Sequence, residues 1–238
     1  MKKFTWALLG LFLVVPAQSQ ELNPPVYPTR SDTIALADKL EVQGTMHVMV
    51  FTDLQREPRV SFQGPEPLLS DAMATVKDGT LTLAFKDGKP YSSNPGSRLS
   101  AVVYLPSIDG VKVEKSPAEV RVFGNNSDEF SAAVGGAGQI KIERLEAKRM
   151  NAAIGGAGSI RIEGTADEAS FAIGGAGSIE GKRLRVATAK IAVGGAGSVY
   201  ADVSDTADIV VGGSGRVEIV GGATCNIRPD SIDKVECR

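Results

Sequence analysis

The amino-acid sequence predicts an all-β protein, a right-handed parallel β-helix (solenoid) with coils of about 18–20 residues. The first observation is a glycine-rich phrase that occurs five times, with starts 20, 19, 20 and 18 residues apart, at Val134, Ile154, Ile173, Val193 and Val211. The second is the alternation of apolar and polar residues on both sides of each phrase, which is the period of a β-strand. Such repeats stack so that each unit contacts only its neighbours, and parallel crossovers are normally right-handed.

The N-terminus has the composition of a secretory signal peptide. Lys2 and Lys3 precede an apolar run from Phe4 to Val15, and the small residues Ala17 and Ser19 suit a signal peptidase. We therefore expect a signal peptide over residues 1–19 and a Pro-rich leader over residues 20–30. The apolar run is too short to span a bilayer, and no later segment approaches that length. The mature chain is thus predicted to be exported, to the periplasm or the cell envelope or medium, without a transmembrane segment.

Charge and composition narrow the classes of partner. The net charge of the full chain is −2, and it becomes −4 when Lys2 and Lys3 leave with the signal peptide. No basic patch with interleaved aromatic residues is present, so a nucleic-acid partner is not expected. Aromatic residues make up only 5% of the chain, so the core is expected to consist of Val, Ile, Leu and Ala.

Residues 31–121 are predicted to be β-structure that continues or caps the stack. Alternation or apolar runs indicate strands at 34–36, 40–42, 46–51, 74–77, 80–85, 99–105, 111–113 and 120–122. Asp78-Gly79 lies between two of these runs and predicts a β-hairpin. The sequence does not decide whether this part belongs to the same solenoid or forms a separate subdomain.

Residues 122–222 contain the glycine-corner repeats, each predicted to be a strand, a tight corner and a second strand. We expect glycine at the corners for two reasons: a sharp turn visits positive φ, where a Cβ is penalised, and stacked corners lie only about 4.8 Å apart. The remaining seven or so residues of each unit are expected to form a third side or a loop.

One outward-facing column is apolar and small. Two residues before the first glycine of each phrase stand, in order, Ala133, Ala153, Ala172, Ala192 and Val210, a set that we call the alanine stripe. A flat apolar stripe is either covered, by the strands of residues 34–122 or by another subunit, or used as a docking surface for a partner strand or a polymer.

The only two cysteines, Cys225 and Cys237, lie within the last 14 residues. In an exported protein such a close pair indicates a disulfide, which would close a C-terminal cap over residues 223–238. Two free thiols at a redox or metal site are the alternative, but no helper residues lie nearby in the sequence.

No catalytic, cofactor-binding or metal-ligating residues are predicted. The glycine phrases lack the spacing of a nucleotide-binding loop, and Ile or Val occupies the position where a calcium-binding nonapeptide repeat requires Asp. The single histidine, His47, lies in an apolar run and is expected to be an ordinary strand residue. Glu143 and Glu163 form the only like-charged acid pair, and paired carboxylates are the minimum for acid–base hydrolysis of glycosides.

The sequence resembles the GIN-domain family, named as the head of autotransporter adhesins. The resemblance covers residues 31–222 and rests on the turn sequence from Val76 to Leu83, on Val102-Val-Tyr-Leu-Pro106 and on the repeated Gly-Gly-Ala-Gly-Ser-Ile phrase. In members of the family the corner sequence is more often Ser-Gly-Ser-Gly, and here Ala replaces most of those serines. The resemblance implies a β-helical, secreted or periplasmic bacterial domain, and it supplies no catalytic residues.

The leading functional hypothesis is a non-enzymatic, adhesin-like binding or structural module of the bacterial envelope. Its expected partner is an envelope protein or a polysaccharide. The alternatives are a polysaccharide-active enzyme on a β-helix and a scaffold that forms homo-oligomers through the alanine stripe.

Overall fold

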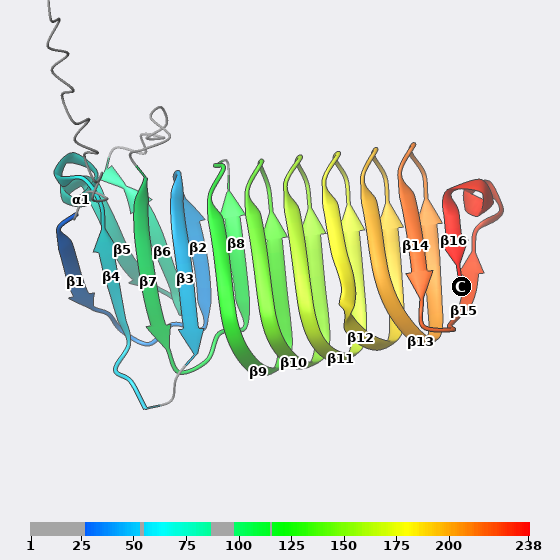
Figure 1. Cartoon of the computed structure of the whole chain (residues 1–238), viewed down its shortest axis with the longest axis horizontal. Coiled ribbons are helices and arrows are strands. Elements are labelled where there is room, and N and C mark those ends of the chain that lie inside the picture. The colour runs from blue at the N-terminus through cyan, green and yellow to red at the C-terminus, as the bar shows by residue number, and fades with distance from the viewer. Residues whose placement is uncertain (1–26, 53–54, 87–97, 115) are drawn as a thin grey trace, which may run out of the picture.

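The computed structural model describes residues 27–52, 55–86, 98–114 and 116–238, and these form a β-solenoid of about six turns (Figure 1). The predicted all-β solenoid is confirmed, while the handedness of its coils stays a prediction. The expected signal peptide, and the expected leader up to residue 26, lie outside the described residues.

Five long strands form the regular part of the solenoid, and each of them crosses two opposite walls. They are β9 (Glu119–Val134), β10 (Gln139–Ile154), β11 (Ser159–Ile173), β12 (Ser178–Val193) and β13 (Ser198–Val211). We call the wall of their first halves wall I and the wall of their second halves wall II. Neighbouring strands are parallel and paired in both walls, with Ile140 opposite Ile160 in wall I and Ile154 opposite Ile173 in wall II. The residues expected to form a third side instead continue each strand into wall II.

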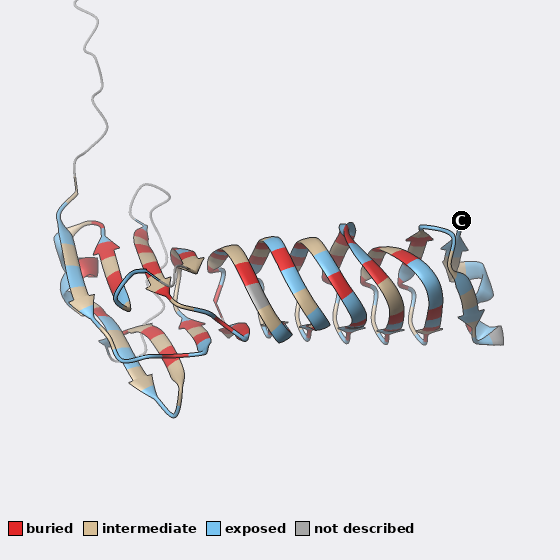
Figure 2. Cartoon of the chain, turned by 90° about the horizontal axis from the view of Figure 1, so that it is seen from below, coloured by how far each residue is buried: buried red, intermediate tan, exposed pale blue. Residues whose placement is uncertain are grey.

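The walls meet at two different edges (Figure 1). At the corner edge, the glycine phrases lead from wall II of one coil to wall I of the next. At the bend edge, each long strand turns in its middle, for example around Arg144 in β10. Inward-facing aliphatic residues of both walls are buried between these edges, whereas the residues between them face outwards (Figure 2). A large side chain of one wall can face a small residue of the other. Phe171 of wall II packs against Gly181 of wall I, where an added Cβ would lie 3.6 Å from the ring.

At the corners, glycine is required by the close approach of the next coil. A Cβ added to the second glycine of a phrase would lie 2.2 Å or less from a carbonyl oxygen of the preceding corner, as it would at Gly156, Gly175, Gly195 and Gly213. No corner glycine has a positive φ, so the expected left-handed conformation was wrong and only the stacking reason holds. The hydrogen-bond ladder runs through the corner, where Ala176 N–H donates to Gly156 O at 3.0 Å.

The N-terminal strands lie in the same two walls but not in chain order. They are β2 (Lys39–Gln43), β3 (Met46–Thr52), β6 (Thr80–Phe85), β7 (Leu99–Leu105) and β8 (Gly110–Glu114). In wall I, β3 is inserted between β7 and β9, and in wall II, β2 is inserted between β6 and β8. All these pairs are parallel, so this part continues the stack.

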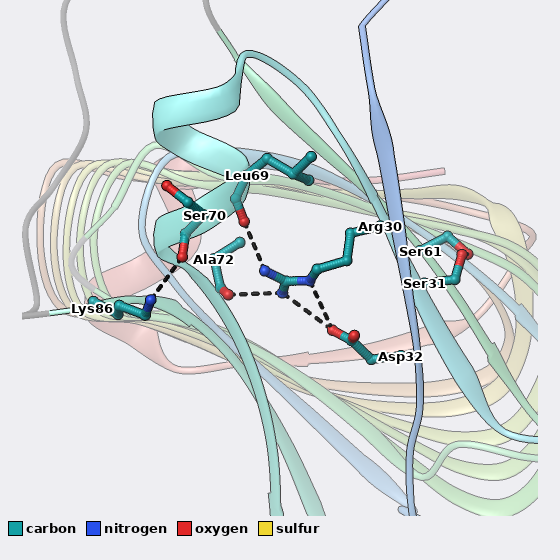
Figure 3. Close-up of polar contacts among 8 residues, drawn as sticks. All are labelled: Arg30, Ser31, Asp32, Ser61, Leu69, Ser70, Ala72 and Lys86. Carbon is teal, nitrogen blue, oxygen red and sulfur yellow. Dashed lines mark hydrogen bonds and ion pairs between the residues drawn. The ribbon is translucent and has the colours of Figure 1, made fainter.

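The N-terminal end of the stack is closed by antiparallel strands and one short helix. They are β1 (Thr29–Thr33), β4 (Arg59–Gln63), β5 (Ala72–Lys77) and α1 (Glu66–Asp71). Arg30 of β1 donates to Leu69 O at 2.7 Å and to Ala72 O at 2.8 Å, which ties the edge strand to α1 (Figure 3). The strand expected at 34–36 was wrong, since β1 begins earlier, within the expected leader, and α1 was not foreseen.

The C-terminal end is closed by shorter strands that continue both walls and by a 3₁₀ helix. These elements are β14 (Arg216–Val220), β15 (Thr224–Ile227), the 3₁₀ helix η2 (Pro229–Lys234) and β16 (Val235–Cys237). The disulfide between Cys225 of β15 and Cys237 of β16 is formed. The hydroxyl of Ser231 in η2 accepts a hydrogen bond from Val211 N–H at 2.9 Å. The helix and the disulfide thus hold the cap on the last long strand.

Candidate functional site

The alanine stripe is aligned and open on wall II. Its five residues are direct register partners on successive strands. Ala153, Ala172 and Ala192 are exposed, while Ala133 and Val210 at its two ends are half-buried. The N-terminal strands do not cover the stripe, because they extend the stack lengthwise and Lys112 of β8 takes the next place in the same column. Within the described part of residues 34–122, the strands therefore leave the stripe uncovered.

A polar hollow of about 340 Å³ runs beside the alanine stripe. It lies on the outer columns of wall II and is lined by Arg149, Asn151, Glu168, Ser170, Thr188, Lys190, Thr206 and Asp208, among others. Hydrogen bonds cross from coil to coil on this face: Asn151 donates to Glu129 at 3.0 Å, and Asn226 donates to Asp208 at 2.9 Å. Wall II therefore offers a flat apolar strip bordered by donors and acceptors in fixed positions.

Wall I carries a second candidate surface, which is created by an irregularity in β12. Against β13, the register jumps from Gly181 opposite Ala201 to Arg185 opposite Asp202. The intervening residues 182–184 have no partner on that strand and form a bulge. Bulges re-aim side chains and are common beside functional sites. Here the bulge turns two cations, Lys182 and Arg183, in opposite directions along the wall.

The two cations of the bulge reach carboxylates on different coils. Lys182 Nζ contacts Glu218 Oε1 on β14 at 3.0 Å and passes 4.8 Å from the centroid of the Tyr200 ring. Arg183 Nη1 donates to Glu163 Oε1 on β11 at 2.9 Å. A pocket of about 540 Å³ lies between them. We call it the bulge pocket and define it by Arg161, Glu163, Glu180, Lys182, Arg183 and Tyr200.

Sequence reasoning did not identify the bulge pocket. Its outward column, which includes Arg161, Glu180 and Tyr200, reads as the mixed-charge face of any solvated sheet. One signal was present: Gly181 interrupts the column in which Ile142, Ile162 and Ile219 point inwards. Such a glycine in a strand pattern often marks a bulge, but the partner strands that turn a bulge into a pocket are not written in the sequence.

Glu143 and Glu163, the acid pair noted in the sequence, each have a cationic partner of their own. Glu143 pairs with Lys141, and the hydrogen bond and charge of that ammonium hold the pKa of the carboxyl below its ordinary value. Glu163 pairs with Arg183. A general acid in glycoside hydrolysis needs a raised pKa, so the environment of Glu143 disfavours that role.

The described residues offer few other candidates for a functional site. His47 lies in β3 between Glu119, whose Oε2 is 3.1 Å from Nδ1, and Arg98, whose Nη1 is 2.7 Å from Nε2. Within the described ranges, no group of three or more His, Cys, Asp or Glu residues is placed to hold a metal ion. Over the same ranges, no helix has the length and apolar character to cross a membrane.

Comparison with known proteins gives one family. The family model described as "Putative auto-transporter adhesin, head GIN domain" matches residues 38–223. This match confirms the resemblance inferred from the sequence over residues 31–222. None of the curated proteins matches the chain.

Solved structures with similar folds include three from Bacteroides and Parabacteroides species. A putative adhesin from Bacteroides fragilis NCTC 9343 superposes with a TM-score of 0.77 at 20% identity, over 90% of this chain and 95% of the other. A putative lipid binding protein from Parabacteroides distasonis ATCC 8503 gives a TM-score of 0.66 at 15% identity, over 89% and 94%. A putative adhesin from Parabacteroides merdae ATCC 43184 gives 0.62 at 18% identity, over 89% and 93%. At these identities the likeness shows a shared fold.

Proposed function

Because the chain belongs to the GIN-domain family of auto-transporter adhesin heads, we propose that it is an exported, non-enzymatic, adhesin-like binding module of the bacterial envelope. Export is supported by the signal peptide predicted over residues 1–19. The disulfide between Cys225 and Cys237 also supports export, since disulfides persist in oxidising compartments such as the periplasm and the cell surface.

The observation that carries the binding role is the open alanine stripe on wall II. Five small apolar residues in register make a flat strip along which another backbone or a polymer chain can lie closely. Ion pairs and amide hydrogen bonds on the neighbouring columns hold donors and acceptors ready beside it. Side chains fixed before binding lose less entropy when a partner docks. The partner we propose is a protein or polysaccharide of the envelope.

A non-enzymatic role is supported by the state of the one acid pair. Both carboxylates are engaged by cations, and the pKa of Glu143 is shifted downwards, away from that of a proton donor. Hydrolysis of a glycan would require one of the two to be protonated at neutral pH.

The test is binding of the chain, without residues 1–19, to envelope fractions of the bacterium that produces it, with Ala172→Glu as the stripe variant. A charge in the middle of the stripe should weaken binding at least tenfold. The matched control is Ala176→Glu, because Ala176 is also exposed and belongs to the same coil but lies at the corner edge. Equal binding by both variants, or no binding by the unmodified chain, would refute the proposal.

Solution mass distinguishes the scaffold alternative. If the stripe served self-association, the native chain would show a concentration-dependent mass in light scattering, and Ala172→Glu would reduce it to the monomer. The proposed module stays monomeric in both forms.

A further inference from the structure

The geometry points to a second binding site, the bulge pocket on wall I, with an uncharged linear glycan as its ligand. This inference extends the proposed binding role, but it uses the wall opposite the alanine stripe. It stands on the volume of the pocket, the pairing of its cations with carboxylates, the placement of an aromatic ring and the continuation of the pocket into a groove.

The bulge pocket has the size and walls of a ligand site. Its volume of about 540 Å³ falls within the range of about 300–1,000 Å³ typical of small-molecule pockets. The bulge at residues 182–184 supplies the wall nearest the bend edge, and Tyr200 on β13 supplies a half-buried ring. An amphipathic ring of this kind offers an apolar face to the C–H groups of a sugar and a hydroxyl to its oxygens.

Each cation of the pocket is paired with a carboxylate, which favours an uncharged ligand. Arg161 Nε donates to Glu180 Oε2 at 2.8 Å, Arg183 pairs with Glu163, and Lys182 pairs with Glu218. Glu218 is further engaged by Arg238 at 3.4 Å. A uronate or phosphate would therefore have to compete with carboxylates already in place, at a cost in desolvation and repulsion.

The same pairs are well suited to hydroxyl groups. A sugar hydroxyl both donates and accepts, so two neighbouring hydroxyls can accept from a guanidinium and donate to a carboxylate at the same time. Such bonds to charged groups are shorter and stronger than those between neutral groups. The side chain of Glu163 is only 25% exposed, so its position is set before a ligand arrives.

The pocket continues into a groove along the stack. A second hollow of about 150 Å³ adjoins it on wall I and shares Arg161 and Glu180 with it. That hollow extends over Gln139 and Ser159 towards Glu119, again with cations and carboxylates on adjacent coils. Because the strands of wall I repeat at a constant spacing, a groove across them suits a polymer with a repeating unit.

The experiment measures binding of the chain, without residues 1–19, to soluble glycans by affinity electrophoresis and calorimetry. The uncharged probes are a β-glucan, a mannan, a galactan and a xylan, and the charged probe is polygalacturonate. We expect binding to at least one uncharged glycan, with affinity reduced at least tenfold by Tyr200→Ala and by Arg183→Gln. Arg183 is largely exposed, so its replacement tests the site without endangering the fold.

Lys148→Gln is the matched control, because Lys148 is also an exposed cation paired with a carboxylate, Asp128, but lines neither the bulge pocket nor the polar hollow of wall II. It should leave glycan binding unchanged. Binding of polygalacturonate alone, failure of every uncharged glycan, or equal binding by the Tyr200 and Arg183 variants would overturn the inference. Ala172→Glu separates the two proposals, since it should weaken envelope binding through wall II without changing the affinity for the purified glycan.

Discussion

The two edges of the solenoid both depend on glycine, but for different physical reasons. At the corner edge, the glycines have ordinary backbone angles, and a Cβ is excluded by the carbonyl oxygen of the preceding coil. At the bend edge, the chain enters the left-handed region, with φ of 68° at Gly124 and 144° at Gly164, and at Gly164 a Cβ would also lie 2.1 Å from Leu145 O. A glycine-rich motif is therefore no proof of a left-handed turn, because close stacking of backbones selects the same residue.

The edges also differ in how much they vary. Four of the five corners have the phrase Gly-Gly-Ala-Gly and the fifth has Gly-Gly-Ser-Gly. The register between neighbouring strands, in contrast, shifts at the bend edge, after Ile142, after Arg161 and after Gly181. Nearly identical corners fix the stacking of the coils, so insertions at the opposite edge do not disturb the core. The bulge pocket lies beside the largest of these insertions. The comparison suggests that the corner edge maintains the stack while the bend edge diversifies the surface.

The largest expected effect comes from adding one methyl group at the corner edge. Gly175→Ala would place its Cβ 2.0 Å from Gly156 O, and no side-chain rotation can relieve a contact between a Cβ and a backbone oxygen. The coils would have to separate locally, so we expect a loss of at least about 3 kcal/mol in the free energy of unfolding. Denaturant-induced unfolding measures this loss.

The adjacent glycine is the control for this prediction. A Cβ on Gly174 would meet nothing within 4 Å, and its φ is not positive. Gly174→Ala should therefore change stability by no more than about 0.5 kcal/mol. If both substitutions were equally costly, the turn conformation and not the stacking would explain the corner glycines.

The second prediction concerns the bend edge, at a position where a backbone angle is limiting. Arg144 has a φ of 59° and occupies the position in its coil that Gly124 occupies in the preceding coil. A left-handed non-glycine residue costs about 1–2 kcal/mol, and the added freedom of glycine in the unfolded chain offsets about 0.5–1 kcal/mol. Arg144→Gly should thus stabilise the fold by about 0.5 kcal/mol. Arg144→Ala keeps the Cβ and should bring no gain in thermal unfolding, and a gain of equal size would point to the side chain instead.

The sequence predicts the repetitive part of the fold well because the repeat itself encodes the register. When Ile154 and Ile173 stand at the same place in successive phrases, stacking the phrases pairs them, as is observed. The closeness of Cys225 and Cys237 in an exported chain likewise predicts the disulfide. Both inferences use contacts between segments that are equivalent or near in sequence.

The parts that sequence reasoning missed depend on contacts between distant, dissimilar segments. The alternation of residues 40–42 and the apolar run of residues 46–51 indicate two strands, but not that β2 and β3 are inserted between strands that follow them in the chain. The helix α1 has only six residues, too few to show a helical period. For the same reason the bulge pocket was missed, since Lys182 meets Glu218 across two coils and 36 residues.

The smallest expected effect is a pH dependence that belongs to the bend edge alone, because the corner phrases carry no titratable side chain. Lys141 lowers the pKa of Glu143, which lies directly before the bend. A carboxyl with a lowered pKa in the folded state contributes stability above its unfolded pKa, about 4.3, and loses it as the pH falls further. For a pair this close to the surface the contribution is about 0.5 kcal/mol.

Lys141→Met should therefore reduce the free energy of unfolding by about 0.5 kcal/mol at pH 7 and by progressively less below pH 4, as measured in urea. Gln139→Met is the control, because it places the same side chain two residues earlier on the same face without removing a charge. The difference in free energy of unfolding between Gln139→Met and the native chain should not change with pH. Parallel pH profiles for the native chain and Lys141→Met would show that the ion pair beside the bend contributes nothing, and acid sensitivity would then no longer distinguish the two edges.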